Sequence, residues 1–341
     1  FISQRFLCIT LWYFCVFFFF FYLSLNQLTG TIPETISKLT KLYYFSVRFN
    51  QLTGTIPSFF GSLSLLEQFS VYTNKMVGTI PPELGKLRNL GTYSIHHTTS
   101  YYCQVWLTFP LLVWSQIEFF IAHTNDFEGS IPTALGDVTS FKAISLSSNR
   151  LSGSIPETFC QLRNLFEIEI FSNSLTSTLP DCFTRLTNLE NLNLNNNKLR
   201  GRLPSGMGSN WMKLLNLDLS YNYMSGPLPN SLAKLPAIAS IVLQDNRFSG
   251  NLNFITNESL PSCTFFDVAS NAITGPLPQD LFRLPQLQHI LLSSNCFTGQ
   301  LPESVCQSPQ VQTLSMNGLA SGNECNIVRI WNSYFSSKDF G

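Results

Sequence analysis

The chain has 341 residues, a length that fits either two ordinary domains or one long array of repeats. Charged residues make up 12% of it, about half the share typical of soluble domains, and 20 basic residues balance 20 acidic ones. Because no basic stripe runs along the sequence, nucleic acid is not expected as a partner.

Residues 1–24 form a hydrophobic leader that does not share the pattern of the chain after it. The stretch from Phe6 to Leu23 contains no charged side chain and is just long enough for a membrane-spanning helix or for a long signal peptide. An alternative interpretation is a retained intron, since the aromatic run from Phe17 to Tyr22 would be encoded by a T-rich tract. We therefore expect either a membrane or signal segment or a retained intron at this end.

From Leu25 to Leu319 one template recurs, LxxLxLxxNxLxGxIP, as in LENLNLNNNKLRGRLP from Leu189 to Pro204. Its fixed point is an asparagine that returns every 24 or 25 residues, with a single step of 51. The asparagines are Asn26, Asn50, Asn74, Asn125, Asn149, Asn173, Asn197, Asn222, Asn246, Asn271 and Asn295. A period of this length is typical of leucine-rich repeats.

The template predicts stacked coils. Leu192 and Leu194 alternate with Asn191, Asn193 and Asn195, so the leucines of a short strand face inward while the asparagines face outward. One repeat cannot bury its apolar side alone, whereas a stack of repeats can. The repeated asparagine is expected to turn the chain out of the strand and to bond backbone groups of that turn and of the neighbouring coil. The glycine four residues later suits a tight approach, so the turn with Ser177 in its place should be strained.

The step of 51 residues marks an interruption at about residues 91–117. Deleting 27 residues, Gly91 to Ile117, restores a spacing of 24 between Asn74 and Asn125. Codons near both ends of this stretch fit splice sites, so the favoured interpretation is a retained intron. The alternative is a genuine island loop inside the array.

The half-repeats GTIP (Gly54 to Pro57) and GPLP (Gly226 to Pro229) resemble those of plant-type leucine-rich-repeat proteins. This family includes the ectodomains of receptor-like kinases, receptor-like proteins and polygalacturonase-inhibiting proteins. The resemblance implies an α/β repeat solenoid, with a curved parallel β-sheet on the concave face and short 3-10 or irregular segments on the convex face. It also implies a noncatalytic module that binds a protein or peptide ligand, located extracellularly or at the cell-surface membrane. The alternatives are a membrane-tethered receptor-like fragment in signalling or an inhibitor of an extracellular hydrolase.

The register of the repeat then selects outward strand positions as candidate ligand contacts. An aromatic-rich end is expected to grade into an acidic, polar end, and Glu169, Asn193 and Asp218 should line up across three coils. Such a surface would combine aromatic anchors with carboxylates that select basic groups. The candidates are Tyr44, Arg48, Gln68, Tyr72, His123, Glu167, Glu169, Phe171, Asn191, Asn193, Asn195, Asp218, Asp245 and Asp267.

Catalysis is not expected, because Glu167 and Glu169 should be solvated and lack a reason for divided pKa values. No cofactor and no metal site is expected either. Asn257 begins a single N-x-S glycosylation motif. Six cysteines lie outside the leader and the interruption, and Cys306 with Cys325 is the expected disulfide.

The tail, residues 320–341, is expected to form a C-terminal cap that hides the last apolar layer. Ile327, Ile330 and Trp331 have the spacing of an apolar helix face. A linker to a further domain is the alternative.

Overall fold

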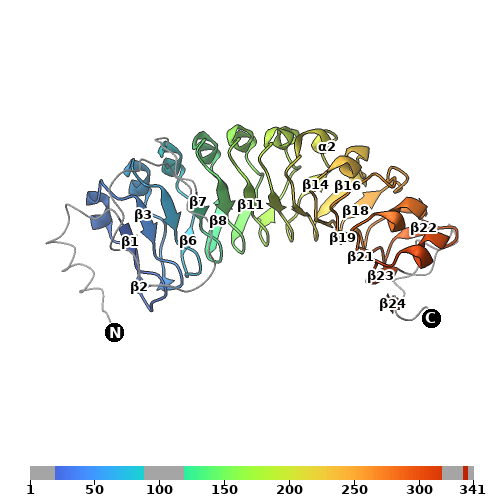
Figure 1. Ribbon diagram of the computed structural model, residues 1–341. Coiled ribbons are helices and arrows are strands. Elements are labelled where there is room, and N and C mark those ends of the chain that lie inside the picture. Colours follow the sequence, from blue (N-terminus) through green and yellow to red (C-terminus); the bar gives the residue numbers. More distant parts are fainter. Residues whose placement is uncertain (1–19, 88–118, 317–332, 337–341) are drawn as a thin grey trace, which may run out of the picture.

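The computed structural model describes residues 20–87, 119–316 and 333–336. They form an arched solenoid in which each coil contributes one strand to a long sheet on the inner side of the arch and, in nearly every coil, a short helix to the outer side (Figure 1). The sequence prediction of a curved α/β leucine-rich-repeat solenoid is thus confirmed. The expected interruption at 91–117 and the apolar tail residues Ile327, Ile330 and Trp331 lie outside the described residues.

The long sheet has one strand per coil, and its strands follow the order of the sequence. Twelve run parallel and the thirteenth, β24, pairs antiparallel with β23. The strands are β1 (Phe20–Tyr22), β3 (Tyr44–Ser46), β5 (Gln68–Ser70), β7 (Phe119–Ile121), β9 (Ala143–Ser145), β11 (Glu167–Glu169), β13 (Asn191–Asn193), β15 (Asn216–Asp218), β17 (Ser240–Val242), β19 (Phe265–Asp267), β21 (His289–Leu291), β23 (Thr313–Met316) and β24 (Ser333–Ser336).

A second set of short strands follows the turn of each coil and forms small parallel sheets on one flank of the solenoid. These flank strands lie between the asparagine of the repeat and the residue that follows its glycine. They are β2 (Thr29–Gly30), β4 (Gln51–Leu52), β6 (Val77–Gly78), β8 (Asp126–Ser130), β10 (Arg150–Gly153), β12 (Ser174–Leu175), β14 (Arg200–Gly201), β16 (Tyr223–Pro227), β18 (Arg247–Ser249), β20 (Thr274–Pro276) and β22 (Cys296–Thr298).

The outer side consists of five-residue 3-10 helices, each of which begins directly after the proline of the repeat. Proline suits this place because it fixes φ and its missing N–H costs no hydrogen bond there. The helices are η1 (Glu34–Lys38), η2 (Ser58–Ser62), η3 (Pro82–Lys86), η4 (Thr133–Asp137), η5 (Glu157–Gln161), η6 (Asp181–Arg185), η7 (Asn230–Lys234), η8 (Gln279–Arg283) and η9 (Glu303–Gln307). One coil instead has a short α-helix, α2 (Met207–Asn210).

The asparagine of each repeat, here called the ladder asparagine, ties neighbouring coils together. The Oδ1 atom of Asn50 accepts the N–H of Leu28 at 3.0 Å, and its Nδ2 donates to the carbonyl of Leu23 at 2.8 Å, both in the preceding coil. The same Nδ2 also donates to Val47 in its own turn at 3.0 Å. Each ladder asparagine from Asn50 to Asn295 makes both inter-coil bonds. The bonding expected from the sequence is therefore present along the array.

The coil that precedes residues 88–118 stacks directly on the coil that follows them. Strand β5 pairs directly with β7, with Phe69 opposite Phe120. Asn125 accepts from the N–H of Met76 and donates to the carbonyl of Val71, over sequence separations of 49 and 54 residues. The corresponding bonds of Asn74 span 22 and 27 residues, so both separations grow by 27. The register is thus continuous once 27 residues are left out of the count, as the sequence predicted.

Phenylalanine replaces leucine in the core of the first coils. Phe21, Phe45, Phe69 and Phe120 occupy the same inward strand position, and successive rings stack with centroids 5.3 to 5.8 Å apart. Strand β1 therefore lies within the range 1–24 that the sequence assigned to the leader. The repeat begins earlier than Leu25 because Phe21 fills the place that a leucine holds in later coils.

Ser177 holds the place of the repeat glycine in one coil, and its backbone has φ of 78°. The glycines at this position have φ between 75° and 87°. An L-residue with a β-carbon is disfavoured in this left-handed region, so the strain expected from the sequence is present.

Replacing Ser177 by glycine should raise the free energy of unfolding by about 1 kcal/mol, because the strain of the left-handed serine is removed. Urea denaturation measures the change. Ser174→Gly in the same coil is the matched control and should lower stability by roughly 0.5 to 1 kcal/mol. A Ser177→Gly protein no more stable than the wild type would contradict this account.

Replacing Asn197 by alanine should lower the free energy of unfolding by about 3 kcal/mol. The side chain is buried, and its loss leaves the Leu175 N–H without its partner. The Ile170 carbonyl loses its 2.9 Å bond and keeps only the 3.3 Å bond from Asn173. The exposed Asn253 provides the control, and Asn253→Ala should change stability by less than about 0.5 kcal/mol. Equal unfolding midpoints in urea for the two variants would refute a structural role for the ladder.

Candidate functional site

The inner sheet presents three rows of outward side chains. The first row begins each strand, as Glu167 does; the second ends it, as Glu169 does; and the third lies two residues further on, as Phe171 does. Because the strands pair in register, equivalent residues of successive coils lie side by side, about 4.8 Å apart. The rows therefore form a surface whose chemistry can be read coil by coil.

An aromatic cluster, formed by Arg48, Phe49, Tyr72 and His123, occupies the third row and its edge in the first coils. The rings of Tyr72 and His123 stack with centroids 4.2 Å apart, and Phe49 meets Tyr72 edge-on at 5.3 Å. The Arg48 guanidinium donates to the Tyr72 hydroxyl at 2.8 Å. Burial lowers the pKa of His123, which favours a neutral ring. The sequence did not select Phe49, which lies in the turn just before Asn50 and has 42% of its surface exposed.

Tyr44 begins β3 and stands apart from that cluster. Its ring stacks on Phe20 at 4.9 Å and on Tyr22 at 6.3 Å, both from the first strand. Gln68 follows it in the first row. This end of the inner face is therefore largely aromatic.

Carboxylates and amides occupy the second row further along. Glu169, Asn193 and Asp218 lie opposite one another in adjacent strands, as the sequence predicted. Asn195 joins the last two, since its Nδ2 donates to Asn193 Oδ1 at 2.9 Å and to Asp218 Oδ2 at 2.8 Å. Ser220 donates its hydroxyl to the other oxygen of Asp218 at 2.6 Å. These bonds hold the polar side chains in fixed positions.

Asp267 extends the acidic row by two coils beyond Asp218, with Val242 between them. The side chain is 2% exposed, and its Oδ1 accepts the N–H of Ala269 at 2.9 Å. The pKa of Asp267 is raised from 3.8 to about 6, chiefly by burial and also by the nearby carboxylates of Asp245 and Asp218, while the hydrogen bond from Ala269 acts to lower it. This group is thus a carboxylate held in an unfavourable charged state at neutral pH.

One candidate, Asp245, lies off the rows, and another, Phe171, lies in its row but apart from the aromatic cluster. Asp245 follows β17 and sits in the turn before its ladder asparagine with φ of 52°, so it is not on a strand. Alternation along the strand selects Gln244 as the outward residue, whereas Asp245 directly precedes Asn246, a place that has positive φ in the other coils too. Phe171 lies in the third row but is separated from His123 by Ser147, whose hydroxyl accepts the Phe171 N–H at 3.2 Å.

The three rows are strongly asymmetric in charge. Among the described strands they carry the carboxylates of Glu167, Glu169, Asp218 and Asp267, and their one lysine or arginine is Arg48. Glu167 stands beside Asn191 in the first row. The net charge of zero for the whole chain therefore hides a negative inner face.

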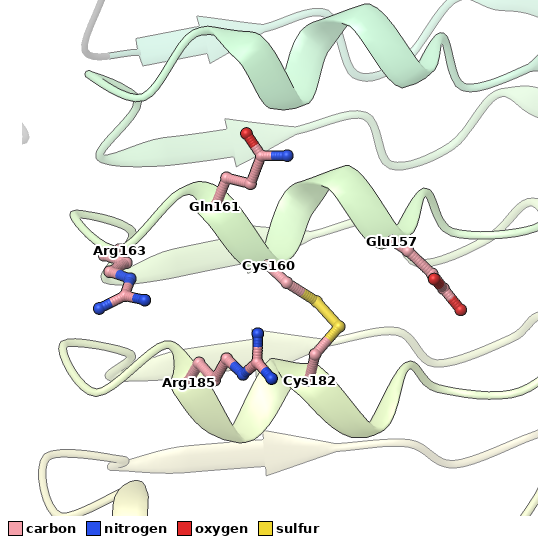
Figure 2. Close-up of a pocket in the computed structure, with 6 residues that line it drawn as sticks. All are labelled: Glu157, Cys160, Gln161, Arg163, Cys182 and Arg185. Carbon is pink, nitrogen blue, oxygen red and sulfur yellow. A yellow bond between two sulfur atoms is a disulfide. The ribbon is translucent and has the colours of Figure 1, made fainter.

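The cysteines differ from expectation. Cys160 of η5 and Cys182 of η6 form a disulfide between adjacent coils, and Figure 2 shows a pocket around it. The expected bond between Cys306 and Cys325 is wrong, because Cys306 is a free, exposed thiol on η9. Cys296, by contrast, is disulfide-bonded. The pocket residues are Glu157, Cys160, Gln161, Arg163, Cys182 and Arg185, so no predicted contact lines it.

Three further expectations from the sequence concern glycosylation, metal binding and a membrane-spanning helix. Asn257 is exposed and thus accessible, while Ser259 of the same motif is buried and its hydroxyl accepts the Thr256 N–H at 2.9 Å. Within residues 20–87, 119–316 and 333–336, no group of three or more metal-ligating side chains comes together. No helix in those ranges is long and apolar enough to cross a membrane, and most of Phe6 to Leu23 lies outside them.

Comparison with known proteins places the chain among leucine-rich-repeat proteins. Models described as leucine-rich repeat match residues 139–199 and, separately, 41–63, 213–235 and 286–308. No curated protein sequence matches the chain.

Solved structures resemble the solenoid. The ectodomain of the Arabidopsis thaliana membrane receptor kinase GASSHO1/SCHENGEN3, in complex with CASPARIAN STRIP INTEGRITY FACTOR 2, is 28% identical with a TM-score of 0.75, over 89% of this chain and 32% of that one. The plant peptide hormone receptor RGFR1, in complex with RGF2, is 30% identical with a TM-score of 0.67, over 86% and 46%. A plant ice-binding protein is 26% identical with a TM-score of 0.53, over 71% and 70%.

The chain therefore carries leucine-rich repeats, and its fold resembles the ectodomains of plant leucine-rich-repeat receptors. It spans about a third to a half of the length of the two receptor ectodomains. Folds of this kind typically serve as noncatalytic binding scaffolds, and function resides in the residues that the coils present.

Replacing Asp267 by asparagine should abolish a pH dependence of stability. The pKa of this carboxyl is about 6 in the folded chain and 3.8 in the unfolded chain, so the folded chain binds more protons between these values. The wild type therefore loses stability as the pH rises from about 4 to about 6. Asparagine stays neutral and retains an acceptor for Ala269. At pH 7 the variant should be more stable by roughly 2 to 3 kcal/mol at most.

Urea denaturation between pH 4 and pH 7 tests this expectation. Asp181→Asn, which alters an exposed carboxyl on the outer side, is the control and should keep the wild-type profile. An Asp267→Asn protein whose stability falls with pH as steeply as that of the wild type would exclude Asp267 as the source.

Proposed function

We propose that the inner face binds an extended peptide or protein segment that combines an aromatic or aliphatic anchor with a basic side chain further along. The observation that carries this proposal is the asymmetry of the three outward rows. They place Arg48 within an aromatic cluster at one end and Glu169, Asp218 and Asp267 at the other.

The aromatic cluster is suited to anchoring an apolar side chain. Tyr72 is already held by stacking on His123 and by the hydrogen bond from Arg48, so little side-chain freedom is lost when a ligand binds. Phe49 adds an exposed ring at its edge. Rigid aromatic and arginine side chains of this kind dominate the energetics of many interfaces.

The acidic rows are suited to a lysine or arginine. Both oxygens of Asp218 are positioned by Asn195 and Ser220, and Glu169 Oε2 accepts the Ser145 hydroxyl at 3.3 Å. Because Asp267 is disfavoured as an anion by burial and by its acidic neighbours, a ligand cation nearby would relieve that cost. Charge complementarity would also accelerate association and reject acidic ligands.

The spacing of the two ends sets a ligand length. Tyr72 lies two residues after β5, and Asp218 ends β15. These strands are five steps apart in the sheet order, or about 24 Å at 4.8 Å per step. An extended chain covers about 3.3 Å per residue, so roughly seven residues separate the anchor from the cation. A peptide of about ten residues therefore spans the surface.

The structural neighbours support this class of function. One similar structure is a peptide hormone receptor in complex with RGF2, and another is a receptor ectodomain in complex with a factor. The same comparison supports our proposal of an extracellular or cell-surface location, and the disulfide between Cys160 and Cys182 accords with an oxidising compartment.

Selection from a displayed library of random twelve-residue peptides tests the proposal. Bound peptides should be enriched in an aromatic or aliphatic residue and in a lysine or arginine about seven positions away. Tyr72→Ala should weaken binding of a selected peptide about tenfold or more. The pair Glu169→Gln and Asp218→Asn should weaken it about threefold or more, and only while the peptide keeps its cation.

Met212→Ala removes an exposed apolar side chain away from the inner sheet and is the control, with affinity unchanged within about twofold. Enrichment of acidic peptides would refute the proposal. The same conclusion would follow if Tyr72→Ala and the double variant bound selected peptides as tightly as the wild type.

A further inference from the structure

A second charged surface lies on the flank strands β14, β16 and β18, which adjoin one another in Figure 1. Lys198, Arg200 and Arg202 follow one ladder asparagine, and Arg247 follows another two coils later. All four side chains are exposed. We call these four residues, together with Tyr223 between them, the basic patch.

The charges of the basic patch are not neutralised. No carboxylate of the described residues lies within 4.0 Å of any of its four cations. Arg150 is an arginine of the same flank whose charge is neutralised. It occupies the same place in its repeat as Arg247 and forms an ion pair with Asp126 at 2.7 Å. The patch is therefore an uncompensated cationic surface on a chain of zero net charge.

Tyr223 organises two of the guanidinium groups. The Arg200 Cζ atom lies 6.0 Å from the centre of the Tyr223 ring, and the Arg247 Cζ atom lies 5.0 Å from it, from the coils on either side. Stacking against a ring occupies the face of a guanidinium and leaves the N–H groups at its edge free. Two arginines are thus presented with their donors available for a carboxylate.

The surface beside the basic patch is uncharged and carries hydroxyl groups. Thr176 and Thr178, in the preceding coil, are exposed, and Thr178 bridges directly to Arg200 in the backbone. Ser152 and Ser154 continue the same strip one coil earlier. The hydroxyl of Thr176 donates to the Gly153 carbonyl at 3.3 Å, which fixes its orientation and leaves its lone pairs toward solvent.

We infer that this flank binds a carboxylated polysaccharide. The arginines bind carboxylates on the sugar rings, and the ordered hydroxyl strip bonds the hydroxyl groups of the same polymer further along. A linear polymer fits because coils recur about every 4.8 Å along the array and so offer donors at regular intervals. Duplex DNA and polyglutamate match the cations but carry no hydroxyl groups along the polymer to pair with the hydroxyl strip.

Binding of the full chain to alginate, in which every ring bears a carboxylate, is the test, with calcium chelated and affinity measured by biolayer interferometry. The wild type should bind alginate, and added salt should weaken binding. Arg200→Gln, Arg202→Gln and Arg247→Gln combined should weaken it about tenfold or more. Tyr223→Leu, which releases the stacked guanidinium groups, should weaken it about threefold.

Arg150→Gln is the matched control and should stay within about twofold of the wild type, because Asp126 already neutralises that arginine. The inference is overturned if the triple variant binds alginate like the wild type, or if the neutral propylene-glycol ester of alginate binds equally well. It is also overturned if polyglutamate, duplex DNA or anionic vesicles bind as tightly as alginate. Peptide binding at the inner face should be unchanged in the triple variant, so this inference and the proposed function fail separately.

Discussion

The bonds of the ladder asparagines are the constraint on which this solenoid depends. Each one bonds an N–H and a carbonyl of the preceding coil, and the N–H has this partner only while the neighbour is in place. The carbonyl also accepts from the ladder asparagine of its own coil, as Leu23 does from Asn26. The hydrophobic core obeys the same rule, because Leu192 and its equivalents are buried by the coils on either side. Stability is therefore a sum of contacts between neighbours. This is why pairing of β5 with β7 suffices to keep the array continuous on both sides of residues 88–118.

The same constraint makes the outward rows rigid and regular. A coil that must place its asparagine against the previous turn has no freedom to shift its strand by one residue. Residues such as Glu169, Asn193 and Asp218 are then aligned whatever their chemistry, and substitution at these positions alters the surface without altering the fold. Binding specificity can thus be set coil by coil, while a few anchors supply most of the affinity.

Features that follow from the period were predictable, and features that depend on side-chain direction were not. The alignment of Glu169 with Asp218 and the strain at Ser177 follow from counting residues. The bond between Cys160 and Cys182 spans 22 residues, two fewer than the usual repeat, because adjacent 3-10 helices place offset residues side by side. Stacking of Tyr223 between two arginines likewise depends on rotamers that no sequence pattern specifies.

Opposite charges are segregated on either side of the turn that holds each ladder asparagine. Asp218 precedes Asn222 on the inner face, and Tyr223 follows it on the flank, so a few residues of chain separate an acidic row from the basic patch. The left-handed residue before the asparagine, Tyr221 in this coil, reverses the chain direction there. Because the turn is fixed by the ladder, the two surfaces face different directions. Ligands of opposite charge can therefore occupy them together, with neither neutralising the other's site.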